Sequence, residues 1–247
     1  MKALNALVAT EGRLFLREPV AAFFCLVFPA VLMLVLGSAI PGFTEPSDDI
    51  GGKRPIDLYL PITLAMAIAT VTMTSLLGVL ATYRERGILR RLSTTPVSPV
   101  ALLGAQLIVN MVALLAGSVL AYVVAAIAFG VPLPGSIGAT VVAFLLGAAA
   151  MCAVALVIAA VTPNARVSAG IGTLVYFPMM FAAGVWTPGP MMAASVQRVA
   201  DYTPLGAASQ ALQAAWAGAQ PQTLHLVVMA VVTVACGAIA AKTFRWS

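Results

Sequence analysis

The sequence VALLGAQLIVNMVALLAGSVLAYVVAAIAFGVPLPGSIGATVVAFLLGAAAMCAVALVIAAV, at residues 100–161, decides the fold class. It belongs to a stretch without Asp, Glu, Lys, Arg or His that runs from Leu92 to Ala165. A helix needs about 20 apolar residues to cross a bilayer core, so this stretch is too long for one span. The prolines of VPLPG at 131–135 interrupt it, because proline lacks the amide hydrogen that a continuing helix requires. The stretch therefore predicts two spans, at about 100–129 and 137–161.

Four further apolar runs predict spans at about 20–41, 58–82, 167–186 and 222–241. The chain of 247 residues is 62% hydrophobic and 9% charged, outside the range of soluble globular domains. Strands of a membrane β-barrel would alternate in polarity, whereas these runs are continuously apolar. The first run also resembles a secretory signal ending at Gly37–Ala39, but its length and the 18 residues before it favour a retained span. The sequence predicts an all-α integral membrane protein with six transmembrane helices in one domain, residues 1–247.

Basic residues predict the orientation of these spans. With a cytoplasmic N-terminus, only Lys53, Arg54 and Arg198 of the thirteen lysines and arginines lie outside. We therefore expect a multi-pass protein of a bacterial-type plasma membrane, with both termini in the cytoplasm. The formal net charge of +5 then reflects topology, so we expect membrane lipid and no nucleic acid as a partner.

Two segments outside the spans are predicted to be structured. Residues 1–18 favour a helix on the inner membrane surface, with Arg13 and Arg17 four residues apart and apolar residues at helical spacing, namely Leu4, Leu7, Val8, Leu14 and Phe15. Residues 187–215 are apolar but too interrupted to span, which favours an outer re-entrant hairpin; a helix lying on the surface is the alternative. The residues that shape this outer region are Pro178, Gly184, Trp186, Pro188 and Pro204.

Polar residues within the spans are few. Thr70 and Thr74 lie on a small, weakly polar face of the second span, and Gln106 and Asn110 are amides in the third. Such residues favour close helix packing and hydrogen bonds between helices, and contact with a transported molecule is the alternative. His225, near the outer end of the last span, is predicted to be an interfacial polar residue.

Several kinds of chemistry are missing from the sequence. It has no GxxxxGK[ST] loop for a nucleoside triphosphate, one histidine and therefore no multi-histidine metal site, and no GxSxG nucleophile motif. No acid lies deep in a predicted span, which disfavours ion-coupled transport. Cys25, Cys152 and Cys236 are predicted to be inert thiols. We expect no enzyme activity, cofactor or metal in this chain, so energy for uphill transport would come from another chain.

The densest charge lies in residues 83–97, YRERGILRRLSTTPV, between the second and third spans. Its arginines obey the positive-inside rule and would also contact anionic headgroups. That interpretation does not account for Glu85 among four arginines, nor for Gly87 and Thr95-Pro96. We therefore favour a docking surface for a cytoplasmic protein over headgroup binding alone.

The order of these parts resembles the ABC-2 type (type V exporter) permeases over essentially the whole chain. Glu85-Arg86-Gly87 matches that family's E-x-G motif, and Leu92 with Pro96 matches its L-x-x-x-P motif. The resemblance implies that 83–97 is a coupling helix that docks into a separate P-loop ATPase subunit, which binds ATP and Mg. The docking residues would be Arg84, Glu85, Arg86, Gly87, Arg90, Arg91, Thr95 and Pro96.

The resemblance further implies two ATPase copies and a second permease chain, identical or related. The modest aromatic content, 7%, favours an exporter of drugs, antibiotics or lipid-like molecules over a polysaccharide permease. The main alternative is a non-transport membrane sensor or assembly module that binds a cytoplasmic partner or anionic lipid through 83–97. A passive channel or ion-coupled carrier is disfavoured by the lack of buried ionisable groups.

Overall fold

The computed structural model describes residues 2–88, 99–187 and 192–243. These residues are almost entirely helical and contain no β-strand beyond an isolated bridge between Ser47 and Lys53. Six helices among them are long and apolar enough to cross a membrane. The predicted all-α fold with six spans is therefore confirmed.

The helices along the chain have the following bounds. The part before the third span comprises α1 (Lys2–Arg17), α2 (Pro19–Ala22), α3 (Phe28–Ala39), α4 (Pro55–Thr70) and α5 (Leu77–Glu85). The rest comprises α7 (Pro99–Phe129), α8 (Ile137–Val161), α9 (Ala165–Ala182), α10 (Ala194–Asp201), α11 (Pro204–Trp216) and α12 (Thr223–Thr243). π-helical segments join α2 to α3 at Phe23–Val27 and α4 to α5 at Val71–Leu76, so the first two spans are continuous helices, Pro19–Ala39 and Pro55–Glu85.

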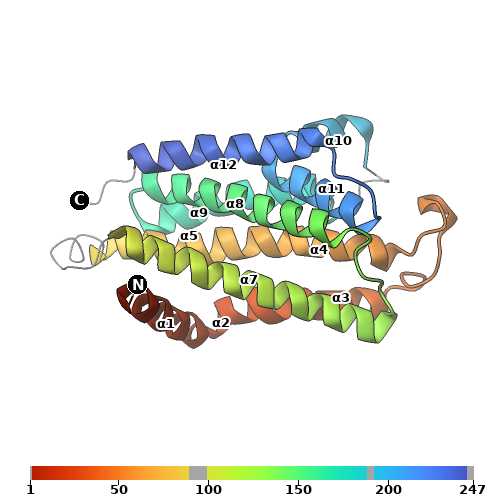
Figure 1. Cartoon of the computed structure of the whole chain (residues 1–247), viewed down its shortest axis with the longest axis horizontal. Coiled ribbons are helices and arrows are strands. Elements are labelled where there is room, and N and C mark those ends of the chain that lie inside the picture. The colour runs from red at the N-terminus through yellow and green to blue at the C-terminus, as the bar shows by residue number, and fades with distance from the viewer. Residues whose placement is uncertain (1, 89–98, 188–191, 244–247) are drawn as a thin grey trace.

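The spans run side by side along one axis of the molecule (Figure 1). One end holds α1, the last turn of α5, the first turn of α7 and the last turn of α12; the opposite end holds α10. We name these the α1 end and the α10 end. The helix Pro55–Glu85 is central, and every side chain from Leu60 to Met73 is buried.

Small residues let the helices around this centre approach closely. At Gly147 of α8, an added Cβ would lie 2.7 Å from Cβ of Ala208 and 3.6 Å from both Cδ1 of Ile68 and Sδ of Met229. Four helices, α4, α8, α11 and α12, therefore meet at this glycine. Any larger residue there would push α11 away.

The helices α10 and α11 form a hairpin at the α10 end. Thr203 caps α11, accepting a hydrogen bond from the Gly206 amide, and Pro204 occupies its first turn. From there α11 is buried among neighbouring helices, and Ala208 reaches Gly147, ten residues into α8. At 1.5 Å per residue, Gly147 lies about 15 Å along the axis of α8 from its first residue. The last turn of α11 accepts hydrogen bonds from the amides of Gly135 and Ser136, at 3.0 and 3.1 Å.

Arg54 connects two spans at the α10 end. Its guanidinium makes two 2.8 Å hydrogen bonds to the Asp57 carboxylate and donates to the carbonyls of Phe129 and Gly130, at 3.0 and 3.1 Å. The hydrogen bond to Asp57 raises the pKa of the Arg54 guanidinium. The start of α4 is thereby held against the end of α7.

Candidate functional site

A buried polar junction joins α1 to two spans at the α1 end. The Glu11 carboxylate is only 7% exposed. The hydroxyl of Tyr83 donates to its Oε2 at 2.7 Å, and Nε2 of Gln106 donates to the same oxygen at 2.5 Å. Behind Gln106, Nδ2 of Asn110 donates to the Gln106 carbonyl at 2.8 Å. These bonds connect α1, α5 and α7.

Glu11 was not among the predicted site residues, although the sequence carries a signal for it. The apolar positions Leu4, Leu7 and Leu14 define one face of α1, and residue 11 falls on that face between Leu7 and Leu14. An acid on the apolar face of a surface helix is costly to bury without partners, so partners on neighbouring helices are to be expected. Gln106, predicted as a hydrogen-bond partner between helices, is one of them.

Arg84 lies against the end of α8. Its Nη1 donates to the carbonyls of Ala159, Ala160 and Thr162 at 2.9, 2.6 and 2.8 Å. The last carbonyls of a helix have no partner within it and carry partial negative charge, which an arginine satisfies. Arg84 therefore holds α5 to the C-terminus of α8.

The next residue, Glu85, binds the start of α9. Its Oε2 accepts a 2.9 Å hydrogen bond from the amide of Ala165, in the first turn of that helix. Carboxylates are stabilised near helix N-termini, where the amides carry partial positive charge. Gly87 then ends the helix with φ of +63°, a left-handed conformation that glycine adopts without strain.

The structure places part of the predicted docking segment. Arg84 and Glu85 contact the α8–α9 connection, whereas Arg86 is exposed and its side chain has no hydrogen-bond partner among the described residues. Four other predicted docking residues lie outside the described residues, namely Arg90, Arg91, Thr95 and Pro96. Of the segment described, Arg86 is therefore the arginine free to bind another molecule.

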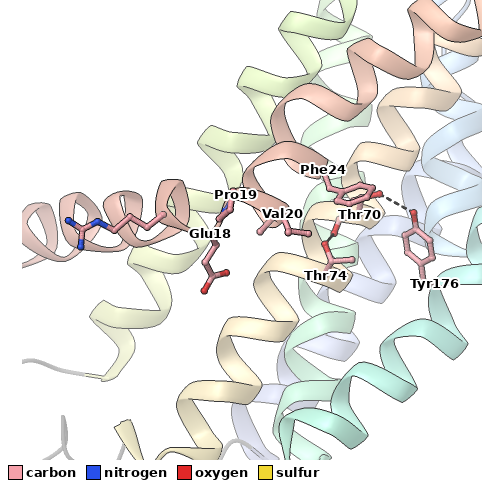
Figure 2. A pocket seen from close by; sticks show the side chains of 9 residues that line it. Glu18, Pro19, Val20, Phe24, Thr70, Thr74 and Tyr176 are labelled. Carbon is pink, nitrogen blue, oxygen red and sulfur yellow. Dashed lines mark hydrogen bonds between the residues drawn. The ribbon is translucent and has the colours of Figure 1, made fainter.

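A cleft of about 720 Å³ opens beside the first span, as Figure 2 shows. Thr70 and Thr74 line it from the central helix and Tyr176 lines it from α9. The hydroxyls of Thr70 and Tyr176 are 3.0 Å apart, and Thr74 donates to the Thr70 carbonyl at 2.6 Å. The wall toward α1 consists mainly of Arg17, Glu18, Pro19, Val20, Ala21 and Phe24. The cleft thus carries hydroxyl groups on one side, and its other side is apolar from Pro19 to Phe24 with the charged pair Arg17 and Glu18 at one end.

A second cleft of about 810 Å³ continues the first toward the α1 end. The two share Arg17, Glu18, Ala21 and Thr74 in their linings. The second also reaches Glu11 and Arg86. One continuous groove therefore leads from the exposed Arg86, past the buried junction, to the Thr70–Tyr176 pair.

Residues predicted to shape the outer region lie at the end of α9 and the start of α11. Pro178 is exposed within α9, Gly184 follows the helix with φ of +84°, and Pro204 is buried in the first turn of α11. Trp186 is 54% exposed and stacks on Phe177 and Phe181, with ring centroids 6.4 Å apart in each pair. Pro188 lies outside the described residues.

His225, predicted to be an interfacial polar residue, lies in the first turn of α12, beside α10. It is 2% exposed, and its Nε2 lies 3.1 Å from Oδ1 of Asp201, which also accepts from Gln210. The hydrogen bond joins α10 to α12. Its two residues are 24 positions apart, so no local sequence pattern predicts that they pair. Within the described ranges, no group of histidines, cysteines and acids is arranged to hold a metal ion.

Comparison with known protein families gives a match over most of the chain. The family model described as ABC-2 type transporter matches residues 2–216, which include α1, the first five spans and the α10–α11 hairpin. No curated protein matches the chain significantly.

Proposed function

The chain belongs to the ABC-2 type transporter family, and from this premise we propose that it moves a hydrophobic or amphipathic molecule out of the cytoplasm or inner leaflet, using ATP hydrolysed by a separate subunit. It is a multi-pass membrane protein and a permease component of an ABC transporter. Family members generally work with a cytoplasmic ATPase subunit. In this proposal ATP and Mg are bound by that subunit, and the permease itself carries out no catalysis.

The observation that carries the proposal is the bonding of the last turn of α5. Within three consecutive residues, Tyr83 reaches Glu11 of α1, Arg84 reaches the end of α8, and Glu85 reaches the start of α9. A partner that displaced this turn would act on all three helices at once, because each bond joins it to a different element. Such an arrangement suits transmission of force from a docked ATPase.

The groove supports the proposed class of substrate. A molecule with an apolar body and a few hydrogen-bonding groups would fit a wall built by Val20 and Phe24 facing the hydroxyls of Thr70 and Tyr176. Ligand sites are commonly apolar with few polar groups, and their volumes of about 300–1,000 Å³ include that of this cleft. Because the groove is open along its length, we propose that a second permease chain, identical or related, closes it.

The proposed orientation puts the α1 end in the cytoplasm of a bacterial-type cell, where two ATPase copies would bind one to each permease. Basic residues at this end include Arg13, Arg17, Arg84 and Arg86. The α10 end, with its hairpin, would then form the outer part of the pathway. Most residues of α11 are buried by the neighbouring helices, so this part of the hairpin is surrounded by protein.

Docking is tested by reversing the charge of Arg86. The variant Arg86→Glu removes no hydrogen bond that the described side chain makes, so membrane insertion and thermal stability should stay unchanged. Retention of the P-loop ATPase on the affinity-purified permease should fall at least about tenfold, because losing one buried charged contact costs about 2–5 kcal/mol.

The matched control is Arg198→Glu, an exposed arginine of α10 at the opposite end. It should retain the ATPase fully. Persistent absence of any P-loop ATPase from the unaltered protein, or equal loss in both variants, would contradict the docking proposal and favour a non-transport module.

The substrate path is tested separately at Thr74, which is exposed in the cleft. Thr74→Trp should lower transport into inverted vesicles while the ATPase still co-purifies, because the indole occupies the path and not the docking surface. The control Thr243→Trp alters an exposed threonine with the same bond to a carbonyl four residues earlier, outside the cleft. Unchanged transport in Thr74→Trp would refute the assignment of the groove.

A further inference from the structure

Another groove, distinct from the two clefts that form the proposed substrate path, lies between α1 and α7. Its volume is about 470 Å³. The side chains of described residues that line it are apolar apart from one arginine, and they include Val8, Leu16, Leu26, Val109 and Val112. Because Val112 is 60% exposed and Leu16 is 66% exposed, the groove opens to the surroundings of the bundle.

Arg13 is the charged member of this lining. Its side chain is exposed and has neither a hydrogen bond nor an ion pair with any described residue. No acidic side chain is present among the described residues that line the groove. An arginine guanidinium binds phosphate oxygens well, often through two parallel hydrogen bonds. The groove therefore offers an apolar slot with an unpaired phosphate-binding group beside it.

The helix α1 separates this groove from the proposed substrate path. Residues 8, 9, 12, 13 and 16 of α1 line the groove, residues 7, 11, 14 and 17 line the path, and Phe15 between the two faces lines both. Arg17 and Glu18 both line the path, and Glu11, the acid nearest to Arg13 in sequence, is buried on the path side of α1 and does not line the groove. Figure 1 shows α1 beside the first half of α7, at the α1 end of the bundle.

We propose that this groove is a binding site for an anionic phospholipid of the adjoining leaflet. One acyl chain lies between α1 and α7 along Leu26, Val109 and Val112, and the phosphate of the headgroup binds Arg13. The amphipathic α1 lies where such headgroups are found, and anionic lipid attracts each surface arginine by an amount that corresponds to about a fivefold gain in binding. The bound lipid would stabilise the position of α1, and with it the Glu11 junction on the opposite face of that helix.

Gly12 provides a way to fill the groove without disturbing the fold. No atom lies within 4 Å of a Cβ added there, so a leucine side chain would extend into open space. Leucine also favours a helix more than glycine does. Gly12→Leu therefore tests the acyl-chain slot, and Arg13→Gln tests the phosphate contact.

The experiment is native mass spectrometry of the full-length permease after incubation in micelles with dioleoyl phosphatidylglycerol or dioleoyl phosphatidylcholine. The two lipids share their acyl chains and differ in headgroup charge. The unaltered protein should retain phosphatidylglycerol preferentially. Arg13→Gln should reduce that preference about fivefold, and Arg13→Lys should restore part of it. Gly12→Leu should reduce retention of both lipids.

Matched controls are Arg166→Gln, an exposed arginine at the same end of the bundle, and Gly237→Leu, a helical glycine that also has open space around its Cβ. Equal retention of the two lipids by the unaltered protein would overturn the proposal. It would also be overturned if Arg166→Gln lowered the preference as much as Arg13→Gln, or if Gly12→Leu retained as much lipid as Gly237→Leu. None of these results depends on the ATPase, so they are independent of the proposed transport function.

Discussion

The substitution Tyr83→Phe isolates one bond of the junction between α1 and the second span. It removes the hydroxyl that donates to Oε2 of Glu11 at 2.7 Å and leaves the ring, which packs beside Leu102. The bond from Gln106 to the same oxygen remains. The perturbation is therefore the loss of one of two donors to a carboxylate that is only 7% exposed.

The expected magnitude follows from the chemistry of this bond. A hydrogen bond to a charged group contributes about 1.5–3 kcal/mol to stability. Most of that contribution is lost when a buried acceptor loses one of its donors. The bond joins α1 to the bundle, so its loss should lower the free energy of local opening of α1 more than that of the spans. A loss of about 1.5–3 kcal/mol raises the equilibrium constant for local opening of α1 by about 10- to 150-fold.

Hydrogen–deuterium exchange of the detergent-solubilised permease measures this opening. Amides of α1 should exchange faster in Tyr83→Phe by about that factor, whereas amides of α8 and α12 should not change. Adding Glu11→Gln should give less than the sum of the two single effects, because each variant removes the same charged hydrogen bond.

Tyr202→Phe is the control, since Tyr202 is 67% exposed and its hydroxyl has no hydrogen bond among the described residues. It should leave the exchange of α1 unchanged. Unchanged α1 exchange in Tyr83→Phe, or strictly additive effects of the Tyr83 and Glu11 variants, would refute the idea that this bond holds α1.

Three further predictions concern the stability of the solubilised protein, measured by its thermal unfolding. Arg84→Gln should destabilise it by about 1.5–3 kcal/mol, because three carbonyls at the end of α8 lose a charged donor. Gly87→Ala should cost about 1–2 kcal/mol, because alanine is strained at φ of +63° although space is available. Gly147→Leu should cost about 1–3 kcal/mol or more, because the new side chain meets Ala208 of α11.

The predictions for Arg84 and Gly147 each have a comparison that can contradict them. Arg166→Gln removes an exposed arginine from the same end of the bundle, so an equal loss in both arginine variants would exclude a specific role for Arg84. Gly138→Leu alters a glycine in the first turn of α8 with nothing within 4 Å of its Cβ. If it destabilised the protein as much as Gly147→Leu, close packing against α11 would not be the cause.

The six spans were predictable because the signal for each is local. A run of about 20 apolar residues requires a helix in a bilayer, whatever its neighbours are. The break at 131–135 likewise follows from its prolines and agrees with the gap between α7 and α8. Six candidate spans are found in the described residues, as the apolar runs predicted.

The site was predictable only in part. Glu85 and Gly87 were identified through the family motif, and Gln106 through the scarcity of amides in the spans. The bonds that these residues make could not be foreseen, because Glu85 contacts a residue 80 positions away and Gln106 one 95 positions away. Residues that lie outside the described ranges, such as Arg90 and Arg91, stay predictions.

By itself the sequence determined that this chain is a bundle of six membrane helices with a charged segment after the second, since length, hydropathy and charge act on each segment separately. Only the tertiary structure decided which charges are used within the molecule. Arg84 is bound to α8 and Glu85 to α9, while Arg86 and Arg13 remain available to other molecules. The physical reason is that a hydrogen bond requires two groups within about 3 Å, and helix packing alone brings together groups that lie far apart in the sequence.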